Sequence, residues 1–86
     1  MFFVYLLKSL KDGKYYVGQT DDVSNRLKKH NNGEVISTKP RRPFILMGYE
    51  TYDTRDESRW REYDLKQHSD KKKKFIEKIS QQQYGK

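Results

Sequence analysis

Apolar and aromatic side chains fill residues 2–7 and return, after a polar stretch, at residues 15–17. Short runs rich in aromatic and branched residues are typical of β-strands, and the Asp-Gly pair in residues 11–14 favours a tight turn. The pattern therefore predicts an antiparallel hairpin at the start of the chain, with the later segments packed around it.

The length of the turn decides how Tyr5 and Tyr16 are placed. A two-residue loop leaves them on one face but four residues apart, roughly 13 Å at strand rise. A four-residue loop over residues 10–13, with Gly13 at positive φ, pairs Tyr5 with Gly18 and makes the tyrosines diagonal neighbours at roughly 7–8 Å. A three-residue loop with a bulge would put them on opposite faces. The sequence leaves these alternatives open.

Helix signals follow the hairpin. Thr-Asp-Asp at residues 20–22 supplies oxygens for an N-cap, and Asn32-Gly33 supplies a left-handed stop, so a short helix is expected at about residues 22–31. The capping-box spacing that begins at Thr54 predicts a helix to about Gln67. Ser69 is a candidate cap for a third helix, whose apolar positions pack inward.

A loop and a third strand separate the first two helices. Residues 33–43 hold two prolines and three cations, which are Lys39, Arg41 and Arg42. Residues 44–52 then carry apolar side chains at both alternating sets of positions, which predicts a strand with both faces covered. The element order is β-β-α-β-α-α, an α+β arrangement.

The chain has 86 residues, enough for one small core and too few for two domains. We expect a single domain over residues 1–80 and a frayed polar tail over residues 81–86. Alanine is absent and aromatic residues number twelve, so the core is expected to use Phe, Tyr and Trp bulk. Trp60 and Tyr63 are expected to form an aromatic edge of the second helix.

Helical spacing also sets which polar side chains approach the interior. Arg26 and His30 border the apolar stripe of the first helix. In the second helix Ser58, Glu62 and Leu65 follow i, i+4 and i+7, which aims the Glu62 carboxylate inward. An inward acid either pairs with a buried arginine or serves a site, and we favour a site.

The formal net charge is +7 and the sequence pI is near 9.6, which favours a polyanionic partner, nucleic acid first and an acidic membrane surface second. Cysteine is absent and histidines number two, so a disulfide framework and a Cys or His metal site are not expected. No apolar run resembles a secretory signal or a membrane span, and we expect a cytoplasmic protein. The candidate nucleic-acid contacts are the loop cations Lys39, Arg41 and Arg42 and the run Lys71, Lys72, Lys73 and Lys74.

Five positions in order carry a resemblance to a known family. They are Tyr5 within Val-Tyr-Leu, Tyr16 within Tyr-Val-Gly, Arg26 ten residues later, His30 one turn on, and Glu62 in a later helix. Their types and spacing resemble the GIY-YIG endonuclease superfamily, and most closely its small stand-alone bacterial members, over residues 2–76. The name motif has Val in place of its first glycine, and Leu and Val in place of its isoleucines. An asparagine found near the domain end of several members has no clear counterpart.

The resemblance implies a three-stranded antiparallel sheet flanked by helices and a domain that cuts phosphodiester bonds in DNA with one divalent metal ion, Mg²⁺ or Mn²⁺. It implies that Tyr5 and Tyr16 are the two motif tyrosines, Arg26 the phosphate-binding arginine, His30 an assisting group and Glu62 the metal ligand. A single carboxylate binds Mg²⁺ weakly, so phosphate and water would complete the shell.

Two other functions remain open. The first is a nucleic-acid-binding module of the same fold that cleaves weakly or not at all, in which Tyr5 and Tyr16 would be ordinary sheet aromatics. The second is a protein-interaction domain whose positive charge is incidental. DNA is favoured over RNA, a membrane is not expected as partner, and a protein partner could supply specificity because no residue pattern here reads bases.

Overall fold

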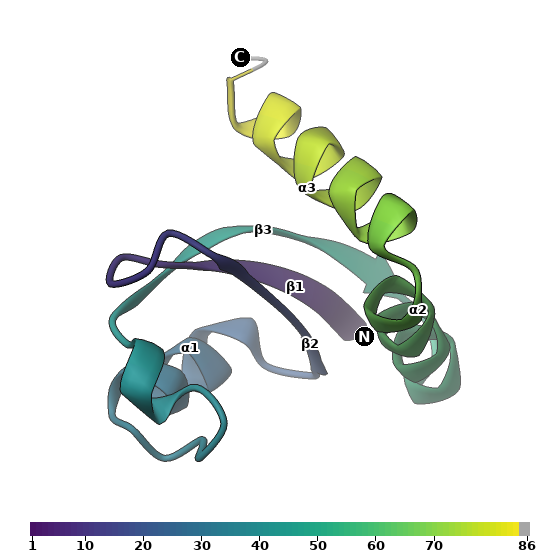
Figure 1. Cartoon of the computed structure of the whole chain (residues 1–86). Helices are drawn as coiled ribbons and strands as arrows, with labels where there is room; N and C mark the ends of the chain where they lie inside the picture. The colour runs from purple at the N-terminus through teal and green to yellow at the C-terminus, as the bar shows by residue number, and fades with distance from the viewer. Residues whose placement is uncertain (85–86) are drawn as a thin grey trace.

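Three strands and three α-helices follow one another as β-β-α-β-α-α in the computed structural model, which describes residues 1–84 (Figure 1). The elements are β1 (Phe2–Ser9), β2 (Tyr15–Thr20), α1 (Val23–Asn31), the short 3-10 turn η1 (Lys39–Arg41), β3 (Phe44–Tyr52), α2 (Arg55–Gln67) and α3 (Ser69–Tyr84). The α+β class and the element order expected from the sequence are confirmed.

The strands form one antiparallel sheet in the order β2-β1-β3, with β1 in the centre. The hairpin pairs Tyr5 with Gly18 and Leu7 with Tyr16, which is the register of the four-residue loop. Gly13 closes this loop at φ +73°, a conformation that glycine adopts without a side-chain clash. Tyr5 and Tyr16 therefore lie on the same face of the sheet.

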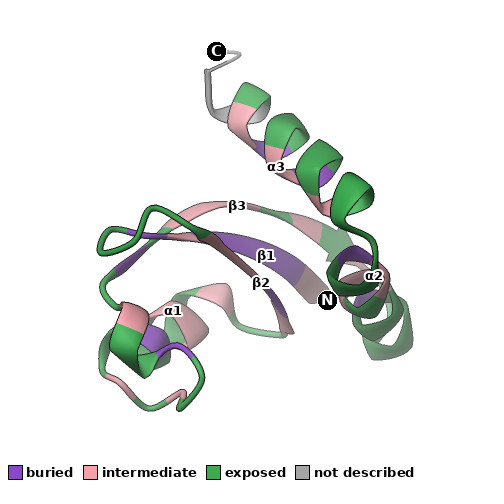
Figure 2. Ribbon diagram, in the orientation of Figure 1, coloured by how far each residue is buried: buried purple, intermediate pink, exposed green. Residues whose placement is uncertain are grey.

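Both faces of β1 are covered, so its middle residues are buried (Figure 2). On one face Val4 and Leu6 pack with Leu65 of α2 and with Phe75 and Ile79 of α3. On the other face a smaller cluster of Tyr5, Leu7 and Phe44 packs against Leu27 of α1 and Tyr16 of β2. Burial of a central strand on both sides explains why residues 2–7 are almost continuously apolar.

Local sequence sets the helix ends as expected. The Asp22 side chain accepts from the Asn25 N–H at the start of α1, and Gly33 follows its end at φ +79°. At α2, Thr54 and Glu57 form the complete capping box. In the part of the chain that the structure describes, no helix is long and apolar enough to cross a membrane.

Three expectations need correction or qualification. The expected aromatic edge of Trp60 and Tyr63 is present, since their rings stack, but Trp60 adds no bulk to the core because 68% of its surface is exposed. Ser69 is the first residue of α3 and not a residue before it. The tail predicted over residues 81–86 overlaps α3, which runs to Tyr84, while residues 85–86 lie outside the described part.

Candidate functional site

Three rings meet on the face of the sheet that α1 covers. The ring centroids of Tyr5 and Tyr16 are 6.4 Å apart, and the His30 imidazole lies 5.9 Å from Tyr5 and 5.1 Å from Tyr16. The β1–β2 register supplies the two tyrosines, and α1 supplies the histidine from its last turn. Tyr5 and His30, which are 25 residues apart in the sequence, are thus in contact.

The Tyr5 phenol is the buried member of the tyrosine pair, with 1% of its surface exposed. Burial raises the pKa of Tyr5 to about 12, although the Arg26 guanidinium acts in the opposite direction. The ring lies across Gly18, where an added Cβ would overlap the phenol. The glycine of the Tyr-Val-Gly motif is therefore required because the Tyr5 ring occupies the place of its side chain.

His30 is fully buried and hydrogen-bonded at both ring nitrogens. Its Nε2 lies 2.9 Å from the Tyr5 hydroxyl, and its Nδ1 lies 2.7 Å from the Thr38 hydroxyl. Burial, with a smaller effect of Arg26, lowers the pKa of His30 to about 4. The imidazole is therefore neutral at physiological pH.

Arg26 projects from α1 toward Tyr5 and His30, since its charge acts on the pKa of both groups. Its Nε is buried and, among the described residues, has no hydrogen-bond partner. The side chain also lines a hollow of about 300 Å³, together with the cations Lys29 and Arg55 and with the acids Asp21 and Asp22. A guanidinium with unused donors beside an open hollow can accept an anion such as phosphate.

Glu62 of α2 is half-buried, as its inward spacing predicts. Its carboxylate pairs with the Lys66 Nζ at 2.9 Å, and that Nζ lies 4.9 Å from the centroid of the Tyr16 ring. The Glu62 charge also acts on the pKa of Tyr5. The structure thus brings Tyr5, Tyr16, Arg26, His30 and Glu62 together from three separate parts of the chain.

The described residues contain no cluster of three or more His, Cys, Asp or Glu side chains that could enclose a metal ion. Glu62 is instead a single hard oxygen donor that is half-buried and paired with Lys66, whose Nζ lies over the Tyr16 ring. Such a donor fits a cation like Mg²⁺ that retains most of its waters and shares a substrate phosphate. Lys66 holds the carboxylate that such an ion would need.

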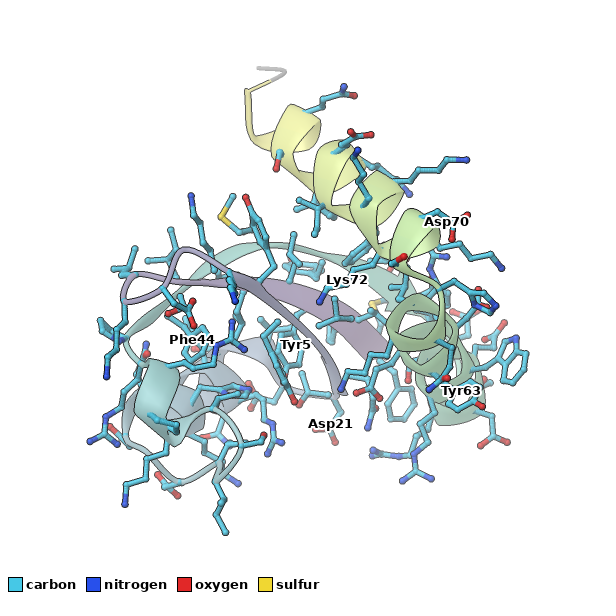
Figure 3. The ribbon with its side chains drawn as sticks, in the orientation of Figure 1. Tyr5, Asp21, Phe44, Tyr63, Asp70 and Lys72 are labelled. Atoms are coloured by element: carbon cyan, nitrogen blue, oxygen red, sulfur yellow. The ribbon has the colours of Figure 1, made fainter. Side chains whose placement is uncertain are left out.

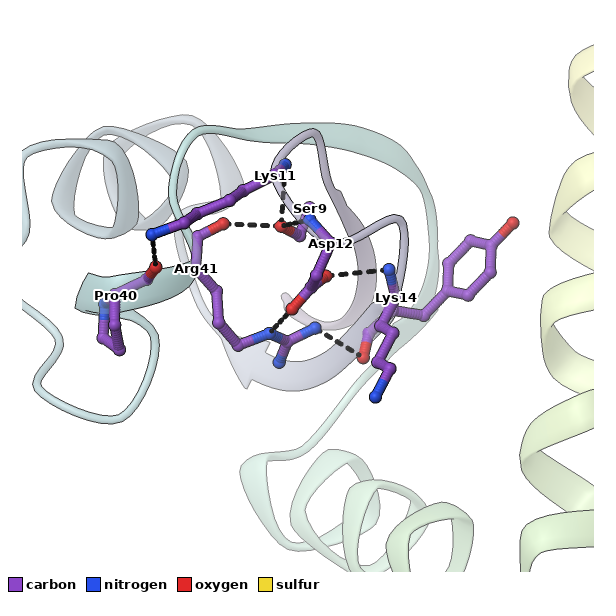
Figure 4. Close-up of polar contacts among 7 residues, drawn as sticks. Ser9, Lys11, Asp12, Lys14, Pro40 and Arg41 are labelled. Carbon is purple, nitrogen blue, oxygen red and sulfur yellow. Dashed lines mark hydrogen bonds and ion pairs between the residues drawn. The ribbon is translucent and has the colours of Figure 1, made fainter.

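The predicted nucleic-acid contacts do not form one surface. Arg41 is bound to the hairpin turn through Asp12 at 2.9 Å, and Lys11 reaches the Pro40 carbonyl beside it (Figure 4). Lys39 and Arg42 are exposed in the same loop. These contacts hold the cationic loop against the tip of the β1–β2 hairpin.

On α3, Lys71, Lys73 and Lys74 are exposed, and Lys71 pairs with Asp64 at 3.1 Å. Lys72 is different: it is half-buried and directed toward the sheet (Figure 3). Burial, and then the positive charge of Arg41 and Lys66, lowers the pKa of Lys72. Lys72 therefore differs from its three neighbours in the predicted nucleic-acid contacts, because position 72 shares the inward stripe with Phe75 and Ile79.

Sequence reasoning missed two residues at this site, Thr38 and Lys66. Thr38 lies in a loop, where periodicity carries no information about burial. Lys66 had a signal, because it follows Glu62 by four residues, the spacing of a helical ion pair.

Comparisons with known proteins agree with this geometry. The GIY-YIG catalytic domain matches residues 1–75. UPF0213 proteins of Staphylococcus saprophyticus and Staphylococcus aureus are each 43% identical over 72 residues, which is 83% of this chain and 87% of theirs. The solution NMR structure of a UPF0213 protein from Bacillus halodurans is similar at a TM-score of 0.54 and 36% identity, over 92% of this chain and 85% of that one. The chain therefore belongs to the GIY-YIG superfamily of nucleases.

Proposed function

We propose that this protein is an endonuclease that hydrolyses phosphodiester bonds in DNA with Mg²⁺ or Mn²⁺. The observation that carries the proposal is that two phenols lie near an arginine and an inward carboxylate, and that this arginine, whose buried Nε has no partner among the described residues, also lines an open hollow. Phosphodiester hydrolysis needs a group that takes a proton from water, a cation on the phosphate and a site for a metal. The family indicates a nucleic-acid substrate, with DNA favoured.

Tyr16 is the better candidate for the general base. It is partly exposed, whereas Tyr5 is buried, its hydroxyl is engaged with His30 and its pKa is raised to about 12. A base must reach the water that it deprotonates, within hydrogen-bond distance. Tyr5 and His30 then form the floor of the site and hold Tyr16 in place through ring contacts.

Arg26 binds the scissile phosphate in this proposal. Its guanidinium has five N–H donors, and a phosphate oxygen would satisfy the Nε that has no partner among the described residues. Lys29 of the same hollow would bind a neighbouring phosphate of the strand, and Arg55 could do so once it releases Asp21, with which it pairs at 3.6 Å.

Glu62 would hold the metal ion. When bound there, the ion supplies positive charge to the phosphate oxygens and to the attacking water. Lys66 must release the carboxylate, and its ammonium is then free to bind a non-bridging phosphate oxygen. The exposed cations of the loop and of α3 would attract the DNA backbone without reading bases. We place this activity in the cytoplasm, where chromosomal DNA lies in bacteria such as those of the relatives.

A cleavage assay tests the proposal. Purified protein is incubated with supercoiled, linear, branched and single-stranded DNA, and with RNA, in the presence of Mg²⁺, Mn²⁺ or EDTA. We expect metal-dependent nicking that is lost in Glu62→Gln and kept in Glu77→Gln, which changes an exposed glutamate of α3. Equal nicking by wild type and Glu62→Gln would overturn the metal assignment. Tight binding without cleavage under every condition would instead show the binding module.

A further inference from the structure

A chain of three buried side chains runs from the loop before β3 into the site. Tyr5, His30 and Thr38 each have at most 1% of their surface exposed. The Tyr5 hydroxyl lies 2.9 Å from the His30 Nε2, the His30 Nδ1 lies 2.7 Å from the Thr38 Oγ1, and that hydroxyl lies 3.3 Å from the Val35 carbonyl oxygen. The proposed function assigns no role to Thr38.

The Thr38 end of this hydrogen-bonded series determines which atoms carry the hydrogens. A carbonyl oxygen only accepts, so the single hydrogen of the Thr38 hydroxyl is donated to Val35. The Thr38 Oγ1 must then accept from the His30 Nδ1–H. A neutral imidazole carries one N–H, which leaves Nε2 as an acceptor for the Tyr5 O–H.

The inner end is compatible with the same direction. A guanidinium has donors and no acceptor, so towards Arg26 the Tyr5 oxygen could only accept. The Arg26 charge lowers the pKa of Tyr5 against the larger effect of burial, so the guanidinium lies near the phenol. With an acceptor on the Arg26 side, the phenol hydrogen is free to point to His30. The hydrogen bonds of His30 and Thr38 therefore carry the assignment, and the position of Arg26 agrees with it.

We infer that Thr38 is a positioning residue: by accepting from the His30 Nδ1–H it holds His30 in one neutral tautomer, turns the Tyr5 hydrogen inward and presents the Tyr5 lone pairs to Arg26 and the substrate side. Only the last step of this inference rests on the proposed function. Lys39 and Arg41 belong to the turn η1 that begins directly after Thr38. Thr38 thus links the cationic loop to the Tyr5 phenol through His30.

The tautomer can be measured without any assay of cleavage. Long-range ¹H–¹⁵N correlation spectra of the full chain distinguish an imidazole protonated at Nδ1 from one protonated at Nε2. The chain has two histidines, so His68→Gln assigns the His30 signals. We expect one His30 tautomer, protonated at Nδ1, in the wild type. A wild-type His30 protonated at Nε2 overturns the inference directly and requires no variant to fold.

Two substitutions test whether Thr38 is the cause. Thr38→Val keeps the shape and removes the acceptor, so His30 should shift to Nε2–H or to a mixture, whereas Thr38→Ser should keep Nδ1–H. If Thr38→Val folds and leaves the tautomer unchanged, Thr38 does not position His30.

Kinetics then separate this inference from the proposed function. We expect the cleavage rate at saturating DNA to fall at least about tenfold in Thr38→Val and to recover in Thr38→Ser. A wild type with the expected tautomer and no cleavage of any substrate would contradict the proposed function alone. Unchanged cleavage by Thr38→Val, with its tautomer shifted, would overturn the role of Thr38 in positioning the site.

Discussion

Gly18 is the residue where backbone and site depend on each other most closely. The Tyr5 ring lies directly over it, so the β2 strand can carry no side chain at this position without moving the phenol. Glycine inside a strand lowers the stability of the strand. Here the missing side chain leaves the space that the Tyr5 phenol occupies when it hydrogen-bonds to His30.

Gly18→Ala should therefore destabilise the fold by about 1–3 kcal/mol and break the Tyr5–His30 hydrogen bond. Urea unfolding measures the free energy, and the His30 ring signals in NMR spectra report the bond. Gly13→Asn is a matched control, because its turn needs positive φ but has open space around the missing side chain. Equal, small losses in both variants would show that the ring moves freely.

His30 makes stability depend on pH in a window above that of most carboxylates. Its pKa is lowered from an ordinary 6.5 to about 4, first by burial and then by Arg26, and the rings of Tyr5 and Tyr16 pack against it. The unfolded chain thus binds a proton that the folded chain does not bind between these two pH values. The stabilisation is complete above pH 6.5 and is lost as the pH falls toward 4.

Between pH 7 and pH 5 we expect a loss of about 2 kcal/mol in the free energy of unfolding that is specific to His30. Urea titrations at the two pH values measure it. His30→Gln should be less stable at pH 7 yet lose less on acidification, whereas His68→Gln should behave as the wild type. A wild-type pH slope that persists in His30→Gln would contradict the assignment.

At the scale of elements, β3 holds both helices of the opposite face through one acid. Glu50 accepts from Arg61 of α2 at 3.1 Å, from Lys78 of α3 at 2.9 Å and from the Tyr52 hydroxyl at 2.7 Å. Burial alone would raise the pKa of Glu50, but these donors outweigh it and lower that pKa to about 2. The Glu50 side chain is only 13% exposed, so water cannot readily replace its carboxylate as a partner of Arg61, Lys78 and Tyr52.

Glu50→Gln should cost about 2 kcal/mol, because Arg61 is left half-buried without its charged partner. The wild-type stabilisation is present above pH 4.5 and is lost as the pH falls toward 2. Chemical unfolding at pH 7 measures the cost, with the exposed Glu77→Gln as control. A difference below a few tenths of a kcal/mol would mean that the two ion pairs and the Tyr52 hydrogen bond contribute little.

The elements were largely predictable because their signals are local. Capping residues predicted the start of α2, and the apolar run of residues 44–52 predicted β3. The expectation that both faces of β3 are covered is wrong, because β3 is an edge strand on which Ile45 and Tyr49 are 42% and 46% exposed. Composition says how much aromatic bulk exists and not which copies are buried, so it did not show that Trp60 is exposed. Thr38 and the inward turn of Lys72 depend on contacts between distant segments, which one sequence does not encode locally.

For the molecule as a whole, the excess of positive charge lies on two sides. Lys39 and Arg42 are exposed in the loop that contains η1, and Lys73 and Lys74 are exposed on α3. Figure 1 shows α1 and this loop on one face of the sheet and α3 on the other. A DNA backbone that follows one side therefore cannot meet both pairs at once without bending or wrapping.

Binding to DNA without metal should weaken with salt, and each lost phosphate contact should lower the slope of log affinity against log salt by about 0.9. Replacing Lys39 and Arg42 by Gln should lower this slope by the amount expected for about two lost phosphate contacts. Replacing Lys73 and Lys74 should lower the slope less, because the loop that holds Lys39 and Arg42 adjoins the site. Fluorescence anisotropy at several salt concentrations measures both. A wild type without any salt slope would exclude the phosphate backbone as partner.

The most direct test of the central claim separates chemistry from affinity in single-turnover cleavage of DNA. Glu62→Gln and Tyr16→Phe should each lose cleavage rate by orders of magnitude while binding DNA as tightly as the wild type, since one loses only a charge and the other only a hydroxyl. Tyr63→Phe, which changes an exposed tyrosine on the outer side of α2, should cleave at the wild-type rate. If Glu62→Gln and Tyr16→Phe instead keep the rate at saturating protein and lose affinity, these residues serve binding or folding, and the account of a tyrosine and metal nuclease is contradicted.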